Sequence, residues 1–478
     1  MRTVRWLVSA WTAGCLGTLW CAAARADGDR LLIIAPREFH GALGEFVAYK
    51  QQRRPTDLVA LGDVLAWGTG EFPGADDPEK LKRFLYAAWK ERGTRYVLLV
   101  GDADVMPVRY MVLDRVTAPA FDYAFYPSDL YYADLAEADG SFDDWNGAKD
   151  GFHGAYYGEV RGEKNKSDPI NYDGVDYRPD VALGRWPVSS PEQAAAVAVK
   201  SMAYEKAVEA GGVPTRAALV MVGGWIDARP RMDEWAGKLP AGWTTEKRYY
   251  HEGKEEPPHP TPSEAEVVGL LNSGVGLVLH AGHGSDDVWE GCLSTGSLAK
   301  VSNAGRTPVM ISAGCSTARF ATLPPYEAYA DVSGVEHTGT DRGEVFSEPP
   351  PPPACYAKGT FNKTGLGERL VRDGPDGAVA YIGCNTGSQP CGLTLAEGFV
   401  DGMTKAERET GAVLVGDCWA HAVAYYYERE GLGTIVPDEG WYPASIFFQG
   451  MKFMLFGDPT LPMAGTAATQ ESRQMKSP

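Results

Sequence analysis

The fold is decided by two stretches, Gly276-Leu-Val-Leu-His-Ala-Gly-His283-Gly-Ser-Asp-Asp287 and Pro308-Val-Met-Ile-Ser-Ala-Gly-Cys315-Ser-Thr317. Each begins with a short apolar run, passes through small residues and then presents a reactive side chain. Apolar runs of this length, bounded by turn signals, are typical of buried strands in a parallel sheet. Catalytic groups of open α/β sheets gather beyond the carboxyl ends of such strands. We therefore expect His283 and Cys315 to lie side by side.

This pair of residue types suits nucleophilic chemistry. A thiol is mostly protonated near neutral pH, and the thiolate is its reactive form. An imidazole within hydrogen-bonding reach can take the thiol proton and later give it to a leaving amine. Glycines at 282, 284 and 314 allow another backbone to approach closely. The backbone N–H groups near Gly284, Gly314 and Cys315 are the candidates for an oxyanion hole.

Two other interpretations of these residues stay open. A cysteine at a strand end is often only a small buried apolar residue. A metal site is the other interpretation, because His280 and His283 are three residues apart and Cys292 or Cys315 would join them. Zinc sites usually contain cysteine pairs or a histidine pair on a helix face, and neither pattern is here.

The rest of the chain alternates apolar strand-like runs with helical segments. This alternation predicts βαβ units and a mostly parallel sheet. The N-caps expected for two of the helices are Ser190 and Thr261. The expected strands are 31–34, 56–61, 96–100, 181–187, 217–222, 275–279, 308–311 and 377–383. The expected helices are 42–52, 78–92, 192–205, 262–272, 393–403, 416–428 and 446–455.

Two segments interrupt the alternation. Residues 121–180 are rich in Asp, Gly and Tyr, and a loop of this length inside a domain is usually functional or stabilised by an ion. Its carboxylates could hold structural calcium, but their spacing does not match a helix–loop–helix site, and a solvated acidic loop is the simpler interpretation. The second segment, 344–355, contains five consecutive prolines and is expected to be an extended insertion.

Composition and the N-terminus limit the classes of function. The 478 residues are 44% hydrophobic, which fits a globular α/β protein, and the net charge of −18 argues against binding to nucleic acid. Arg2 and Arg5, an apolar run over 6–21 and Ala24-Arg25-Ala26 predict a signal peptide that ends at residue 26. No later run of eighteen apolar residues follows, so we expect an exported mature chain without a membrane span.

The predicted mature chain contains six cysteines, which are Cys292, Cys315, Cys355, Cys384, Cys391 and Cys418. Export permits disulfides. Cys384 and Cys391 are close enough in sequence to form a bridge, but spacing alone does not fix the pairing.

At this point the motifs resemble those of a known family. Gly282-His283-Gly284-Ser285, followed by Trp289, resembles the His motif of gingipain-type cysteine peptidases, and Ile311–Cys315, followed by Phe320, resembles their Cys motif. The similarity spans roughly residues 30–463. Its further segments, in the family's order, are Tyr96–Asp102, Gly184-Arg185, Tyr204-Glu205, Gly377–Ile382 and Phe456–Leu461.

The resemblance implies a caspase-like α/β/α sandwich with mostly parallel sheets in two subdomains, 27–210 and 211–465, followed by a polar tail at 466–478. It implies that His283 is the general base and Cys315 the nucleophile. The expected activity is that of an exported endopeptidase acting on protein or peptide substrates, without a required cofactor.

The chain also departs from the family pattern. Where gingipains place an acid near the catalytic histidine, this sequence has Val222, so a dyad is expected unless Asp227 or another carboxylate supplies the contact. Asp233 falls near the family's acid that receives a basic substrate side chain, although a solvent-facing helix residue is an equal interpretation. These departures leave a second hypothesis, a non-catalytic surface or binding protein on the same scaffold.

Overall fold

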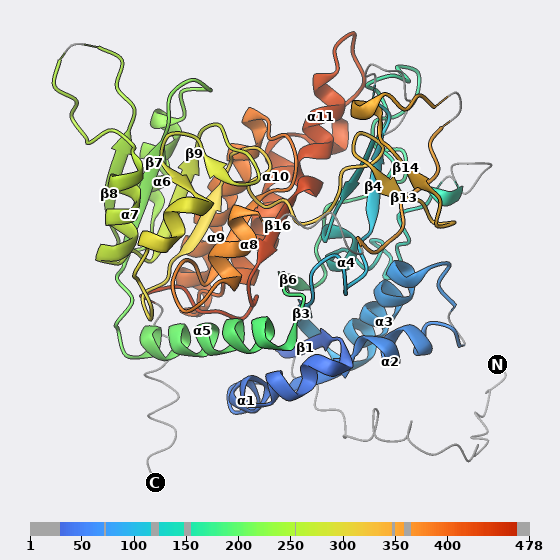
Figure 1. The fold of residues 1–478 in the computed structure, drawn as a ribbon, viewed down its shortest axis with the longest axis horizontal. Coiled ribbons are helices and arrows are strands. Elements are labelled where there is room, and N and C mark those ends of the chain that lie inside the picture. The colour runs from blue at the N-terminus through green and yellow to red at the C-terminus, as the bar shows by residue number, and fades with distance from the viewer. Residues whose placement is uncertain are drawn as a thin grey trace.

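One sheet of ten strands runs through the molecule, and helices cover both of its faces (Figure 1). The structure, a computed structural model, describes residues 29–465 except 71–72, 116–123, 148–153, 254, 347–348 and 358–364. The predicted signal peptide and the polar tail lie outside the described residues. The expectation of an α/β/α fold is confirmed by this layered arrangement.

The strand order places the two halves of the chain in one continuous sheet. From one edge to the other the strands are β2 (Thr56–Ala60), β1 (Arg30–Ala35), β3 (Thr94–Val100), β6 (Ala182–Trp186), β16 (Phe453–Phe456), β15 (Ala380–Cys384), β12 (Val309–Ser312), β9 (Leu277–Ala281), β7 (Arg216–Met221) and β8 (Thr244–Tyr249). All neighbours are parallel except β15 and β16, which are antiparallel. The sheet therefore reverses direction once, at that junction.

Side chains alternate between the two faces of the strands and meet a helical layer on each. On one face, buried apolar side chains of the sheet pack against four helices: α1 (His40–Gln51), α5 (Pro191–Glu209), α7 (Glu264–Ser273) and α8 (Leu366–Arg372). On the other face lie α2 (Leu61–Trp67), α3 (Asp77–Arg92), α4 (Leu130–Ala133), α6 (Arg229–Lys238), α9 (Leu393–Thr410), α10 (Val415–Arg429) and α11 (Tyr442–Gln449). Shorter strand pairs, β4 (Tyr110–Leu113) with β5 (Ala124–Pro127), β10 (Val288–Trp289) with β11 (Leu293–Ser294) and β13 (Tyr329–Ala330) with β14 (Glu336–His337), lie outside the main sheet.

Two local predictions are wrong. The helix expected at 262–272 begins at Glu264, and its N-cap is Ser263, whose hydroxyl accepts from the Glu266 amide, rather than Thr261. The helix expected over 446–455 ends as α11 at Gln449, and Phe453–Phe456 forms the central strand β16. A run of four apolar residues buried on both faces carries no periodicity that distinguishes a strand from a helix.

The described part of the acidic stretch 121–180 satisfies its carboxylates with protein groups. The buried Asp114 just before it accepts four backbone N–H groups from residues 162–165. Asp129 accepts hydrogen bonds from Nη2 and Nε of the buried Arg185 guanidinium, at 2.6 and 2.7 Å. Within the described residues, no group of three or more His, Cys, Asp or Glu side chains is arranged to hold a metal ion. Structural calcium in this stretch stays a prediction.

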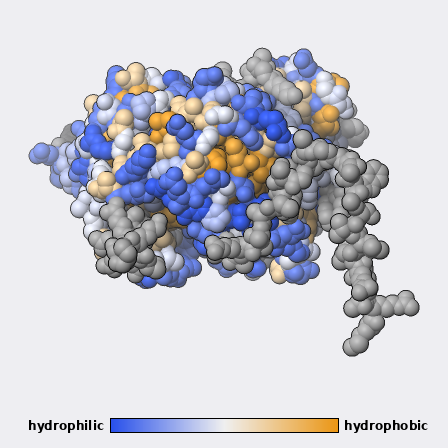
Figure 2. Space-filling view, turned by 90° about the horizontal axis from the view of Figure 1, so that it is seen from below, coloured by the Kyte–Doolittle hydropathy of each residue, from blue (hydrophilic) through white to orange (hydrophobic). Residues whose placement is uncertain are grey.

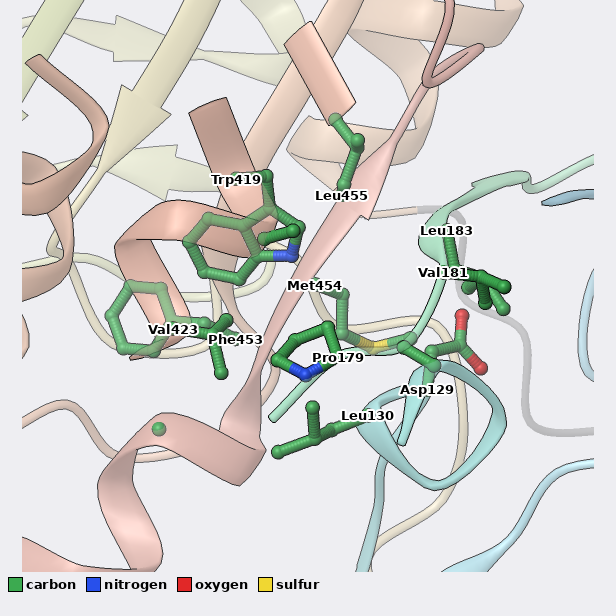
Figure 3. Close-up of a pocket in the computed structure, with 13 residues that line it drawn as sticks. Asp129, Leu130, Pro179, Val181, Leu183, Trp419, Val423, Phe453, Met454 and Leu455 are labelled. Carbon is green, nitrogen blue, oxygen red and sulfur yellow. The ribbon is translucent and has the colours of Figure 1, made fainter. Parts of the chain in front are cut away.

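Figure 2 shows one face of the molecule, and Figure 3 shows a small cavity in its interior. The face in Figure 2, viewed from the side of α1 and α5, has hydrophilic side chains around an apolar area. The cavity in Figure 3, between Trp419, Leu130 and Met454, has about 20 Å³ of free volume, enough for about one water molecule. No helix among the described residues is both long and apolar enough to cross a membrane.

Candidate active site

The strand register brings His283 and Cys315 to equivalent places. β12 and β9 are parallel neighbours, and Ser312 is the register partner of His280. His283 and Cys315 each follow their partner by three residues, so both leave the sheet at the same edge. The loop of residues 282–284 packs directly on the loop of residues 314–317. A Cβ atom on Gly284 would lie 2.6 Å from the Thr317 side chain and 3.1 Å from the Cys315 carbonyl oxygen.

The His283 imidazole is exposed and held from one side. Its Nε2 lies 2.9 Å from the carbonyl oxygen of Gly224, in the loop after β7. Because a carbonyl oxygen only accepts hydrogen bonds, Nε2 carries the proton and Nδ1 is left as the basic nitrogen. Gly224 has a φ of +92°, a backbone conformation that side-chain-bearing residues rarely adopt, so glycine is needed to present this carbonyl.

The Cys315 thiol is half-buried against the loop that follows β15. Its Sγ accepts from the Ser388 N–H at 3.2 Å and donates to the Ser388 carbonyl oxygen at 3.8 Å. Ser316, the next residue, has a left-handed φ of +56° and donates its N–H to Thr386 at 2.7 Å. Strained backbone of this kind clusters at functional sites. No hydrogen bond joins Cys315 to His283 among the described residues, so each group is held by its own loop.

A buried layer supports the two loops from below. His280 Nδ1 lies 2.9 Å from the Ser312 hydroxyl, which also accepts the Gly314 N–H at 3.1 Å. The His280 ring stacks on Trp289 with centroids 4.2 Å apart, and the Trp289 indole N–H donates to Tyr381. Burial lowers the pKa of His280 to about 3, so this imidazole is neutral in the folded protein.

The start of α8 ties the two loops together. The Leu366 N–H donates to the Asp286 carbonyl oxygen at 2.6 Å, and the Gly367 N–H donates to the Thr317 carbonyl oxygen at 3.0 Å. Asp286 follows His283 and Thr317 follows Cys315, so one helical turn fixes the spacing of both loops. Glu368 caps this turn by accepting from the Gly365 N–H at 2.5 Å.

The six described cysteines are all free thiols, so the pair Cys384 and Cys391 forms no disulfide. Burial raises the pKa of Cys292 to about 12 and that of Cys384 to about 11. Burial also raises the pKa of three further thiols, which are Cys355, Cys391 and Cys418. These five thiols are therefore poor nucleophiles near neutral pH.

The positions considered for an acid beside His283 are Val222, Asp227 and Asp233, and each has other contacts. Val222 lies beside the His283 loop, with its N–H bonded to the Ala281 carbonyl oxygen. Asp227 is exposed and forms an ion pair with Arg229 at 2.8 Å. Asp233, on α6, pairs with Lys247 at 2.8 Å and accepts from the Tyr249 hydroxyl at 2.8 Å, both on β8. The contact to His283 is made by the Gly224 carbonyl instead.

The structure separates the two histidines of the candidate metal site. His280 is buried under the loops and stacked on Trp289, whereas His283 is exposed and bonded to Gly224. Sequence reasoning missed Gly224 and Ser388, because both contribute backbone atoms. The only signal for them was the recurrence of small residues after strands, at Gly223-Gly224 and Thr386-Gly387-Ser388.

Comparisons with known proteins identify the family and the fold. The family model for peptidase family C25 matches residues 25–464. The fold is similar to the crystal structure of the Arg-specific cysteine proteinase gingipain R (RgpB), with 16% identity over 92% of this chain and 79% of that chain and a TM-score of 0.56. A complex of the pro- and mature domains of RgpB from Porphyromonas gingivalis matches at 16% identity over 91% and 79% of the two chains, with a TM-score of 0.55.

A further structure, described as a protease, matches at 18% identity over 91% of this chain and 78% of that chain, with a TM-score of 0.56. No curated protein matches by sequence. The family match covers nearly the whole described chain, and the solved structures share its fold. This chain therefore belongs to peptidase family C25, the gingipain family, and is a cysteine peptidase.

Proposed function

We propose that this cysteine peptidase is an exported endopeptidase in which Cys315 is the nucleophile and His283 the general base. The observation that carries the proposal is the strand register, which pairs Ser312 with His280 and so delivers the two reactive side chains to adjoining loops. The orientation of His283 supports it, because the Gly224 carbonyl holds Nε2–H and leaves Nδ1 free to accept a proton.

The reaction follows from these positions. The thiol turns from the Ser388 carbonyl toward the imidazole, Nδ1 takes its proton, and the sulfur attacks the peptide carbonyl carbon. The Gly284 and Cys315 N–H groups donate no hydrogen bond within the described chain, which leaves them for the oxyanion. Collapse of the intermediate expels the amine, which takes the proton from His283. Water, deprotonated by the same imidazole, then hydrolyses the thioester and restores the thiol.

Export is proposed from the N-terminal sequence. Two arginines, an apolar run and a small-residue cleavage pattern at Ala24-Arg25-Ala26 have the order of a secretory signal. N-terminal sequencing of the protein recovered from outside the cytoplasm should begin at Asp27. Recovery of the whole chain, with its first residues intact, in the cytoplasm would contradict export.

The catalytic assignment is tested with internally quenched peptides blocked at both ends, which only an endopeptidase cleaves. Cys315→Ala and His283→Ala should each lower kcat/KM by about a hundredfold or more. Cys355→Ala, which removes another half-buried thiol, is the matched control and should leave cleavage unchanged. Iodoacetamide at pH 7 should label Cys315 before the other five thiols, as followed by mass spectrometry.

Two results would overturn the assignment. One is unchanged cleavage by Cys315→Ala. The other is a Cys315 that reacts with iodoacetamide no faster than Cys292 or Cys384. Labelling of Cys315 without cleavage of any peptide would instead favour the non-catalytic binding protein.

A further inference from the structure

A cavity of about 230 Å³ opens beside the proposed nucleophile. Thr386 and Gly387 form one wall, and Tyr126, Pro324 and Tyr326 line other parts of it. The Thr386 carbonyl oxygen accepts the N–H of Ser316, the residue after Cys315. Gly387 immediately precedes Ser388, whose N–H contacts the sulfur. The wall of the cavity thus continues into the loop that contacts the thiol.

The described part of the cavity lining carries a positive charge. Among its lining residues Arg115 is the one with a charged side chain. Its guanidinium donates to the Tyr126 hydroxyl at 2.7 Å and lies 3.5 Å from Glu163, which is not part of the lining. Arg115 is about 30% exposed at its side chain, so it is accessible from the cavity.

A second basic residue, Lys452, lies next to the part of the cavity wall that Gly387 forms. The buried Lys452 donates to the Gly387 carbonyl oxygen at 2.6 Å. Burial lowers the pKa of Lys452, and the Arg115 charge lowers it further, which places the two cations near each other. A basic substrate side chain entering the cavity would be repelled by Arg115.

The acid that would attract a basic side chain already has a cationic partner at hydrogen-bonding distance, whereas Arg115 and Glu163 lie 3.5 Å apart. Asp233 forms its ion pair with Lys247 and accepts from Tyr249, as described above. Binding of an arginine or lysine of the substrate there would first have to displace the Lys247 ammonium. The charge pattern around the thiol thus differs from that of a site selective for basic residues.

We propose that the cavity beside Cys315 is a substrate subsite for an acidic side chain, with Arg115 as the residue that determines its specificity. This inference rests on the proposed function. The glutamate methylenes pack between Tyr126 and Pro324, and the carboxylate pairs with the guanidinium. Such a charge-assisted contact gives a preference of about tenfold or more in kcat/KM over a lysine at the same position.

The test is a positional scan of blocked peptides that differ only by Glu, Gln or Lys at each position around the cleavage site. At one position the protein should favour Glu over Lys by about tenfold. Arg115→Glu should invert that preference and leave the other positions unchanged, whereas Arg115→Lys should retain it. Arg178→Glu, the same charge change at an exposed arginine paired with Asp176, is the control and should have no effect.

The absence of a Glu preference over Lys at every position would overturn the proposal, and so would a Glu preference that survives Arg115→Glu. Arg115→Gln serves if Arg115→Glu fails to fold beside Glu163. If no peptide is cleaved, the proposed function fails separately. Binding of the Glu and Lys peptides to Cys315→Ala, with and without Arg115→Glu, is then measured by fluorescence anisotropy. A Glu preference that depends on Arg115 supports the subsite, and its absence refutes it.

Discussion

Replacement of Glu368 by glutamine should make the protein more stable at high pH and leave it unchanged near pH 4.5. Glu368 and Asp102 are both fully buried and share a hydrogen bond between their carboxyl groups. Burial, with the neighbouring Asp102 charge, raises the pKa of Glu368 well above its ordinary value of 4.5. Burial likewise raises the pKa of Asp102, and Arg372, 3.9 Å away, favours a negative charge on Asp102. One proton is therefore held between the two groups, on Glu368.

The sign of the effect follows from proton linkage. Between pH 4.5 and the raised pKa of the folded protein, the folded state keeps this proton and the unfolded state loses it. The free energy of unfolding consequently falls by about 1.4 kcal/mol for each pH unit in that window. Glutamine has the shape of the protonated acid, donates to Asp102 and still accepts from the Gly365 N–H, but it does not titrate. The stability advantage of Glu368→Gln should therefore grow by about 1.4 kcal/mol per pH unit above pH 4.5.

Urea denaturation of both proteins from pH 4.5 to 9 measures this difference. Glu264→Gln is the control, because Glu264 is exposed and its hydrogen bond with Lys300 lowers its pKa, the opposite direction. Activity gives a second readout, because the turn capped by Glu368 holds the His283 and Cys315 loops. The variant should keep its activity to a higher pH than the wild type. A stability difference that is constant across the pH range would refute the shared proton.

Three further changes test other parts of the structure. Gly284→Ala should lower kcat/KM by about a hundredfold with little unfolding, because the added Cβ pushes the two reactive loops apart, while Gly269→Ala on exposed α7 should slightly stabilise the protein. The buried His280 imidazole resists protonation, so the free energy of unfolding of the wild type should fall by about 1.4 kcal/mol for each pH unit as the pH drops from 6.5 to about 3. His280→Phe should not show this fall when both proteins are compared by denaturation. Lys200→Met should cost about 2–4 kcal/mol in urea unfolding, since the buried Lys200 ammonium donates to the carbonyl oxygens of Leu370 and Val371 in α8 and of Asp376 after it.

The sequence predicted the strands that carry their own apolar signal. β9 and β12 are buried on both faces, and their continuous apolar runs end at the expected residues within one or two positions. The polar edge strand β8, with the sequence Thr-Thr-Glu-Lys-Arg-Tyr, has no such signal and was not predicted. β16 was predicted as helix, although it is the strand at which the sheet reverses direction. Its place depends on pairing with β6 and β15, which local sequence does not encode.

The candidate site likewise contains residues that could be predicted from the sequence and residues that could not. His283 and Cys315 were predictable because strand ends and reactive residue types are visible in sequence. Their partners were not predictable, because Gly224 and Ser388 act through backbone atoms and lie 59 and 73 residues away. The charge of the adjoining cavity was not predictable either, because Arg115 and Thr386 are far apart in sequence and line the same cavity only in the folded chain. Sequence thus identifies the chemistry more readily than the specificity.

Two of the other family-like segments, Tyr204-Glu205 and Phe456–Leu461, have a structural role away from the site. Glu205 and Asp458 both pair with the buried Lys50, which joins α1, α5 and the segment after β16. Removing one partner of such a buried pair leaves an uncompensated charge, at a cost of about 3–5 kcal/mol. Residues that are needed for such a buried ion pair indicate the fold and carry no information on the substrate. The Arg specificity in the description of gingipain R therefore does not transfer with these motifs, and the preference proposed for this chain rests on Arg115 instead.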